Sequence, residues 1–256
     1  VKNQFSASNF MSSLGYFANF IAYAFMGYPA GMMLQKIGYK KTALWAIAIG
    51  FLGTGVQFLS GEAGSFLVYL IGAFIAGFSM RMLNTVVNPM LNTLGGGGNK
   101  GNQLIQVGGS FNSLMATIVP VLVGYFIGSN VATANIKDAY PALFLAMGIF
   151  ALAFIVLFFV AIPEPSLAKN KLNVKHQHSP FAFRHFVFGA VAIFLYVGIE
   201  VGIQYFINPF MTGSPAEGGL SYDPTIAGSV VGTYWFLMLI GRLGGAASGG
   251  KVSSKA

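Results

Sequence analysis

Residues 186–211 read FVFGAVAIFLYVGIEVGIQYFINPFM, an apolar stretch that contains one charged residue, Glu200. An α-helix needs about 20 consecutive apolar residues to cross the hydrocarbon core of a bilayer, and this stretch is longer than that. Its length and composition therefore predict a transmembrane helix with a carboxylate near its middle.

The composition of the whole chain agrees with this interpretation. Hydrophobic residues make up 55% of the sequence and charged residues only 8%, whereas a soluble domain carries about a quarter charged residues. We therefore expect the lipid bilayer to be the chain's main solvent. The net charge of +8 resides in connectors between apolar blocks, so it indicates topology and not binding to nucleic acid. The absence of cysteine excludes disulfides and thiolate metal sites, and we expect no metal and no cofactor.

Seven apolar segments are long enough to span a membrane, allowing for tilt. They cover approximately residues 9–34, 42–59, 65–91, 103–127, 139–162, 186–211 and 225–247. The prediction is an all-α membrane protein with seven transmembrane helices.

The connectors between these segments give the orientation, because Lys and Arg accumulate on the cytoplasmic side. One alternate set holds ten basic residues: Lys36, Lys40, Lys41, Lys100, Lys169, Lys171, Lys175, Arg184, Lys251 and Lys255. The other set holds two, Lys2 and Lys137, beside the acids Glu62, Asp138, Glu217 and Asp223. We therefore expect the chain to begin outside the cell and to end in the cytoplasm. Because it starts within a loop and stops just after an apolar segment, we also expect it to be a piece of a longer protein.

Polar residues near the middle of the spans form two groups. Arg81, Asn84 and Asn88 occupy positions i, i+3 and i+7 of the third segment, and so lie on one helical face. In the sixth segment one face is likewise shared by residues at i, i+4 and i+8, namely Glu200, Gln204 and Asn208. These amides and charges are suited to binding a hydrophilic solute. The fourth segment adds two further candidates, Gln106 and Asn112.

The charges of Arg81 and Glu200 require compensation, because each costs about 2.5 to 3.5 kcal/mol at the centre of a membrane helix. A hydrated cavity, an ion pair between the two residues, or both would supply it. We expect their two helices to face one cavity. The alternative is that the polar side chains fasten helices together without binding a solute.

The stretch Gly27–Lys41, GYPAGMMLQKIGYKK, resembles the loop between helices two and three of the major facilitator superfamily. The family pattern reads approximately G-x-L-x-D-R/K-x-G-R-K. The matching residues are Gly31, Lys36, Gly38, Lys40 and Lys41, and the resemblance assigns the first four to a gating loop. Gln35 replaces the acid of the pattern and Tyr39 its first base.

Other stretches are similar to the fucose and glucose/galactose permeases of that superfamily. They are LNTVVNPMLNTLG with SFNS, LYVGIEVG and IGRLGG, in the family's order. The resemblance implies a bundle truncated to helices two to eight. Residues 1–162 would belong to the N-terminal half, 163–185 to a cytoplasmic linker, and 186–256 to the C-terminal half.

The function that the resemblance implies is secondary active transport of a monosaccharide by alternating access, not enzymatic catalysis. The partners would be a sugar of the fucose, galactose or glucose type and a proton or sodium ion, and the protein would be a monomer in the cytoplasmic membrane. An acid that serves proton coupling in the fucose permease matches Asn84 here, so Glu200 is the remaining mid-span carboxylate. A permease for another hydrophilic solute or a drug stays open. A seven-helix receptor is disfavoured, because the last span has no retinal-binding Lys and no cysteines join the loops.

Overall fold

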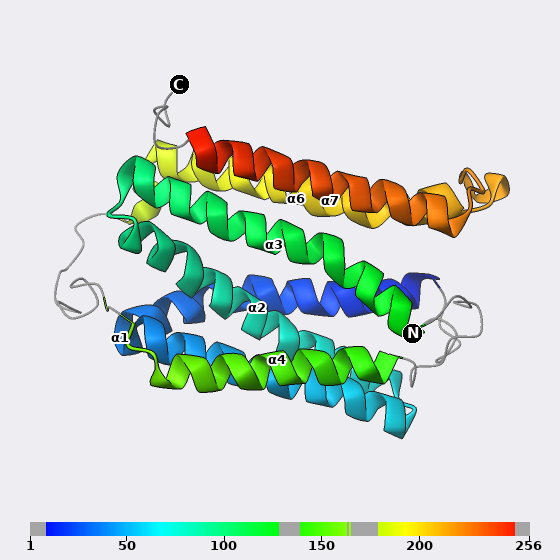
Figure 1. Ribbon diagram of the computed structural model, residues 1–256, viewed down its shortest axis with the longest axis horizontal. Helices are drawn as coiled ribbons and strands as arrows, with labels where there is room; N and C mark the ends of the chain where they lie inside the picture. The colour runs from blue at the N-terminus through cyan, green and yellow to red at the C-terminus, as the bar shows by residue number, and fades with distance from the viewer. Residues whose placement is uncertain (1–8, 128–138, 163, 165–178, 249–256) are drawn as a thin grey trace. The chain divides into compact units, whose positions relative to one another are not determined.

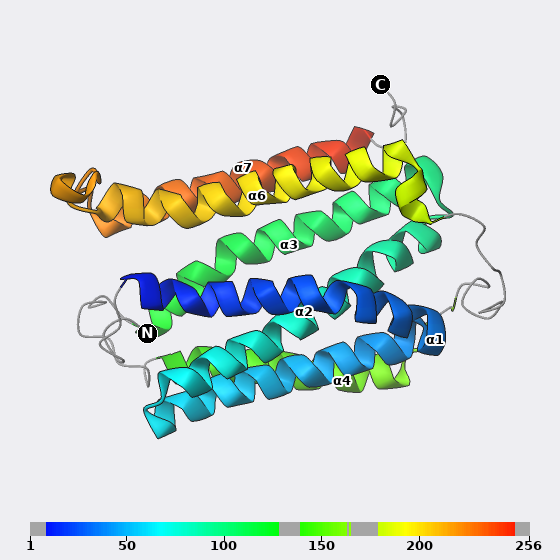
Figure 2. The same cartoon turned by 180° about the vertical axis from the view of Figure 1, so that it is seen from behind.

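A computed structural model describes residues 9–127, 139–162, 164 and 179–248. These residues form mainly long α-helices (Figures 1 and 2). The α-helices are α1 (Asn9–Ala63), α2 (Phe66–Leu94), α3 (Gly98–Ile127), α4 (Tyr140–Phe159), α6 (Arg184–Thr212) and α7 (Pro224–Ser248). Two short 3₁₀ helices are η2 (Pro180–Ala182) and η3 (Pro215–Glu217).

Helix α1 consists of two spans. Its 55 residues would extend for roughly 80 Å if straight, more than twice the thickness of the hydrocarbon core. The helix breaks at Gly38, whose backbone has φ 82° and ψ 179°. Figure 1 shows the chain doubling back at this end of α1. The first two predicted spans, 9–34 and 42–59, are therefore two arms of one bent element, and the bend occupies a single residue.

Five helices in the described part of the chain are long and apolar enough to cross a membrane: α1, α2, α4, α6 and α7. Helix α3, with 30 residues, also has the length of a span. Counting both arms of α1, each of the seven predicted segments corresponds to a helix. Most helices extend a few residues beyond the predicted ends, whereas α4 ends at Phe159, short of the predicted end at 162.

The chain divides into two compact units. The first contains α1, α2, α4 and both ends of α3. The second contains residues 106–117 of α3 together with α6 and α7.

Close packing of α1 against α2 builds the core of the first unit. Gly53 of α1 lies against Ala76 of α2, where a Cβ would come 2.7 Å from the Ala76 nitrogen. Ser79 of α2 donates a hydrogen bond to the carbonyl of Ala46 in α1 at 2.7 Å. Met82 is fully buried beside small α1 residues. Small residues let backbones approach closely, which joins helices in lipid, where there is no hydrophobic drive between them.

The bend of α1 is capped by a carboxylate from the segment that follows α4. Glu164 accepts hydrogen bonds from the backbone nitrogens of Tyr39 at 2.8 Å and Lys40 at 3.0 Å. These are unsatisfied donors at the start of the second arm, where a negative charge also complements the helix dipole. The Lys40 ammonium donates to the carbonyl of Phe158 near the end of α4, at 2.8 Å.

At the opposite end of the first unit, the hydroxyl of Tyr140 at the start of α4 donates to Glu62 at the end of α1, at 2.7 Å. The acidic connector after the second arm thus meets the beginning of α4, whereas the basic bend meets its end. This arrangement agrees with the alternation of connectors that the sequence predicts.

In the second unit α6 and α7 run side by side in both views (Figures 1 and 2). The turn between them is closed by backbone hydrogen bonds from Leu220 to Phe210 and from Tyr222 to Met211.

The glycine-rich connector after the third span differs from expectation. Helix α3 begins at Gly98 and not near residue 103, so the turn is limited to the residues just after α2. Gly96, Gly97 and Gly98 adopt positive φ values there, a conformation that costs glycine little. Basic and acidic connector residues at 128–138 and 165–178, including most of the predicted linker, lie outside the described residues.

We expect Gly38→Ala to destabilise the protein by about 1 to 3 kcal/mol, because φ 82° with ψ 179° belongs to a region that is nearly exclusive to glycine. The added Cβ would also lie 2.6 Å from the Glu164 carboxylate. Thermal unfolding of the full-length protein in detergent, followed by tryptophan fluorescence, measures the effect.

The matched control is Gly148→Ala in α4, where nothing lies within 4 Å of an added Cβ. Alanine favours a helix over glycine, so this variant should melt at or slightly above the native temperature. Equal melting of the two variants would contradict the role assigned to Gly38.

Candidate functional site

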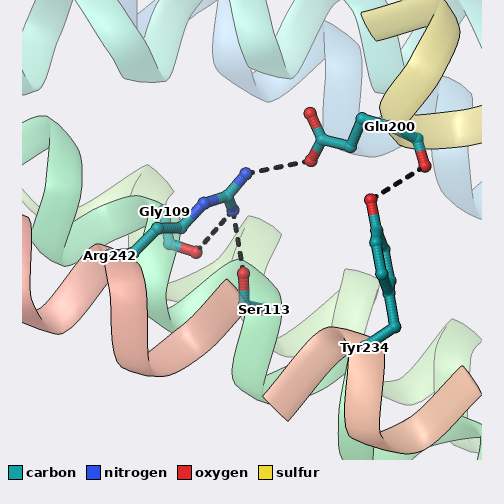
Figure 3. A network of polar contacts seen from close by, with 5 residues as sticks. All are labelled: Gly109, Ser113, Glu200, Tyr234 and Arg242. Atoms are coloured by element: carbon teal, nitrogen blue, oxygen red, sulfur yellow. Dashed lines mark hydrogen bonds and ion pairs between the residues drawn. The ribbon is translucent and has the colours of Figure 1, made fainter. Parts of the chain in front are cut away.

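An ion pair lies among the apolar helices of the second unit. The guanidinium of Arg242 in α7 donates from Nη2 to Oε1 of Glu200 in α6, at 3.1 Å (Figure 3). The two side chains are only 21% and 14% exposed. Each charge would be costly alone at this position, and each compensates the other.

The same guanidinium is also bound by the middle of α3. Its Nη1 donates to the carbonyl of Gly109 and to Oγ of Ser113, both at 2.9 Å (Figure 3). The Tyr234 hydroxyl of α7 donates to the backbone carbonyl of Glu200 at 3.2 Å. Three helices are therefore joined by one network, with Arg242 at its centre.

Local sequence explains why the guanidinium fits. A Cβ at Gly109 would lie 3.4 Å from Cδ of Arg242, so a larger residue would crowd the arginine stem. Ser113 follows one helical turn later, on the same face, and is fully buried. Its Oγ accepts the hydrogen bond from Arg242, while its backbone carbonyl accepts one from the Thr117 hydroxyl.

The sequence offered Arg81 as one way to compensate Glu200, beside a hydrated cavity. The structure pairs Glu200 with Arg242. The reason is geometric, because α6 and α7 are neighbours and present the two side chains to each other. A signal existed in the sequence, since Arg242 is the one charged residue in segment 225–247. A cavity shared by the helices of Arg81 and Glu200 stays a prediction.

Arg81 lies in a second cluster, within the first unit. Its guanidinium carbon is 5.1 Å from the centroid of the Tyr23 ring of α1, within the range of a cation–π contact. Asn84, one turn further along α2, donates from Nδ2 to the Tyr23 hydroxyl at 3.1 Å. Sequence analysis placed Arg81 and Asn84 on one face and missed Tyr23. The Nε atom of Arg81 is buried without a hydrogen-bond partner.

The other candidate residues occupy α2, α3 and α6. Asn88 is exposed on α2, one turn beyond Asn84. Gln106 and Asn112 are exposed on α3, and the Gln106 amide approaches Gly245 of α7, where an added Cβ would be 3.7 Å away. Gln204 and Asn208 belong to α6, and their side chains lie outside the described part of the structure.

The four residues of the expected gating loop surround the bend of α1. Gly38 forms the bend and Lys40 joins it to α4. Lys36 is exposed, and Gly31 lies inside the first arm with open space beside it. Glu164, which the sequence did not single out, supplies the carboxylate that caps this loop.

These features define a multi-spanning helical membrane protein with charged groups held between its spans. A family profile described as Major Facilitator Superfamily matches residues 1–255, and the chain belongs to this family. The family consists of transporters and not enzymes, which confirms the class and the fold that the sequence predicted.

Individual relatives agree. The chain is 29% identical over 252 residues to a glucose/galactose transporter of Brucella abortus, covering 97% of this chain and 60% of that protein. It is 28% identical over 127 residues to the L-fucose-proton symporter of Escherichia coli, covering 50% of this chain and 29% of the relative. The chain thus spans about 60% of the length of the glucose/galactose transporter.

A solved structure shows the same fold. The fucose:proton symporter of E. coli superposes with a TM-score of 0.77 at 17% identity, over 98% of this chain and 66% of that one. The expected resemblance to the fucose and glucose/galactose permeases is confirmed by this match together with the relatives.

We expect Arg242→Gln to destabilise the protein by about 1 to 3 kcal/mol, since breaking this partly buried pair leaves the Glu200 charge uncompensated. Glu200→Gln should have a comparable effect through Arg242. The double variant should cost less than the sum of the two, because it removes both charges together. Thermal unfolding of the native protein, the two single variants and the double variant in detergent measures the coupling energy between Arg242 and Glu200.

Arg184→Gln is the control, because it removes one positive charge at the exposed start of α6. It should melt like the native protein. If the loss of stability in the double variant equalled the sum of the losses in the two single variants, the ion pair would not be stabilising.

Proposed function

We propose that the protein is a secondary active transporter that moves a monosaccharide across the cytoplasmic membrane by alternating access, coupled to a proton or sodium ion. The observation that carries this proposal is the embedded ion pair of Glu200 and Arg242 in a chain of this family. The name of the B. abortus relative, whose sequence aligns with nearly the whole chain, supports a sugar as the solute.

An ion pair between apolar helices is a poor way to gain stability, because desolvation offsets much of its attraction. Intramembrane charges that persist commonly serve ion or substrate pathways. In the described part of the membrane helices, Glu200 is the acid nearest the middle of a span, so we propose it as the coupling group. Protonation of Glu200 would remove its attraction for Arg242 and loosen the link from α6 to α7 and α3.

We propose that amide side chains bind the sugar hydroxyls. In the first unit these are Asn84 and Asn88, which lie on one face of α2 with Arg81. In α6, one face carries Gln204 and Asn208 beyond Glu200. Gln106 and Asn112 of α3 are further candidates. Amides both donate and accept, which matches the hydroxyl groups of a sugar.

We further propose the family's arrangement in two halves, with residues 1–162 in the first, 163–185 as a cytoplasmic linker and 186–256 in the second. The bend of α1 with Gly31, Lys36, Gly38 and Lys40 would act as the gating loop on the cytoplasmic side. The working protein would be a monomer.

Counterflow in proteoliposomes tests the proposal. We expect the full-length protein to exchange radiolabelled fucose, galactose or glucose, and to accumulate it when an inward pH or sodium gradient is imposed. Liposomes without protein are the control. Failure to carry any monosaccharide would overturn the assignment.

The coupling role of Glu200 requires a separate variant. Glu200→Gln should still exchange sugar by counterflow but should lose accumulation driven by a pH gradient, because an amide cannot carry the proton. Accumulation that is independent of pH and unchanged in this variant would remove Glu200 from the coupling mechanism.

A further inference from the structure

Among the described residues of its own unit, no anion pairs with Arg81, a membrane-embedded cation. It lies near the middle of α2, and no ion pair to it occurs among the described residues. The whole chain contains only six acidic residues. Two of them are described in the first unit, and both are engaged at helix ends: Glu62 accepts from Tyr140, and Glu164 caps the bend of α1. Neither is available to Arg81.

The surroundings of Arg81 hold its guanidinium in place but provide no hydrogen-bond partner for its Nε. The Tyr23 ring lies 5.1 Å from the guanidinium carbon, and Gly27 leaves room for the group, since a Cβ there would be 3.3 Å from Nε and Nη2. The Nε atom is buried and lacks a partner. An arginine presents its donors in a planar fork that matches the two oxygens of a carboxylate.

Two polar groups beside the guanidinium have unused capacity. Asn84 donates through Nδ2 to the Tyr23 hydroxyl, which leaves its Oδ1 as an acceptor and the hydroxyl proton of Tyr23 as a donor. The cluster therefore offers a charged fork over the Tyr23 ring, together with one neutral donor and one neutral acceptor. That combination suits a small molecule that carries both a carboxylate and hydroxyl groups.

We propose that the substrate is an acidic monosaccharide, a uronate of the galactose or glucose type, whose carboxylate binds Arg81 while a hydroxyl binds Asn84. This inference rests on the proposed function and specifies its substrate class. The bound carboxylate compensates the charge of Arg81, as Arg242 compensates Glu200 in the second unit. One guanidinium carries a single positive charge. It therefore balances the single negative charge of a carboxylate, but not the nearly two negative charges of a sugar phosphate.

The test compares acidic and neutral forms of one sugar. The full-length protein in proteoliposomes is assayed for counterflow of radiolabelled galacturonate, galactose and glucose 6-phosphate. We expect galacturonate to be exchanged at least tenfold faster than galactose, and glucose 6-phosphate not to be exchanged. Arg81→Gln should reduce galacturonate exchange at least tenfold and leave galactose exchange at its low level. Arg184→Gln, at the exposed start of α6, is the matched control for loss of one positive charge.

Binding gives a second readout that does not need transport. Galacturonate should raise the melting temperature of the native protein in detergent, and of Arg184→Gln, but not that of Arg81→Gln. Should Arg81→Gln fail to fold, Arg81→Lys retains the charge without the planar fork, and we expect it to bind galacturonate about tenfold more weakly than the native protein.

The outcomes separate this inference from the proposed function. Exchange of galactose without galacturonate would overturn the inference and leave monosaccharide transport standing. Equal galacturonate exchange by native protein and Arg81→Gln would show that Arg81 compensates an acid elsewhere in the full-length protein, which also overturns it. Preferential exchange of glucose 6-phosphate would overturn the inference, because it would show that Arg81 binds a sugar phosphate and not a sugar carboxylate. Exchange of no sugar at all would remove both proposals.

Discussion

The Glu200–Arg242 ion pair shows the constraint under which this chain folds. In the spans, water does not compete for polar groups, so a carboxylate is tolerated only where the protein supplies its counter-charge. Arg242 does so at 3.1 Å, and its remaining donors are taken by Gly109 and Ser113 of α3. One guanidinium thus joins α6, α7 and the middle of α3, which lie in one compact unit.

The same requirement acts on the backbone at the bend of α1. A helix that breaks exposes donors at the start of its second arm, and here Glu164 accepts from Tyr39 and Lys40. Only a residue without a side chain leaves room for that carboxylate, and only glycine readily adopts the backbone angles of Gly38. The hydrogen bonds from the α1 bend to Glu164, which follows α4, therefore depend on a glycine at position 38.

Arg81 differs from Arg242 although both are arginines within spans. Arg242 has a carboxylate, a carbonyl and a hydroxyl as partners, whereas Arg81 has the face of Tyr23 and a buried, unpartnered Nε. One cation is neutralised by the fold, whereas the other lies over an aromatic ring and against Gly27, where an added Cβ would come 3.3 Å from its Nε. This difference supports our proposal that Arg81 binds the solute.

The sequence by itself determined the spans, the alternation of connectors and the family. These depend on length, hydropathy and local motifs, which are properties of contiguous residues. It also placed Arg81 with Asn84 on one face, because helical periodicity alone fixes that relation. The partners of the charges were decided only by the tertiary structure. Arg242 lies 42 residues after Glu200, Glu164 lies 125 residues after Tyr39, and Tyr23 lies 61 residues before Asn84. No periodicity connects residues so distant in the chain, and packing alone brings them within hydrogen-bonding distance.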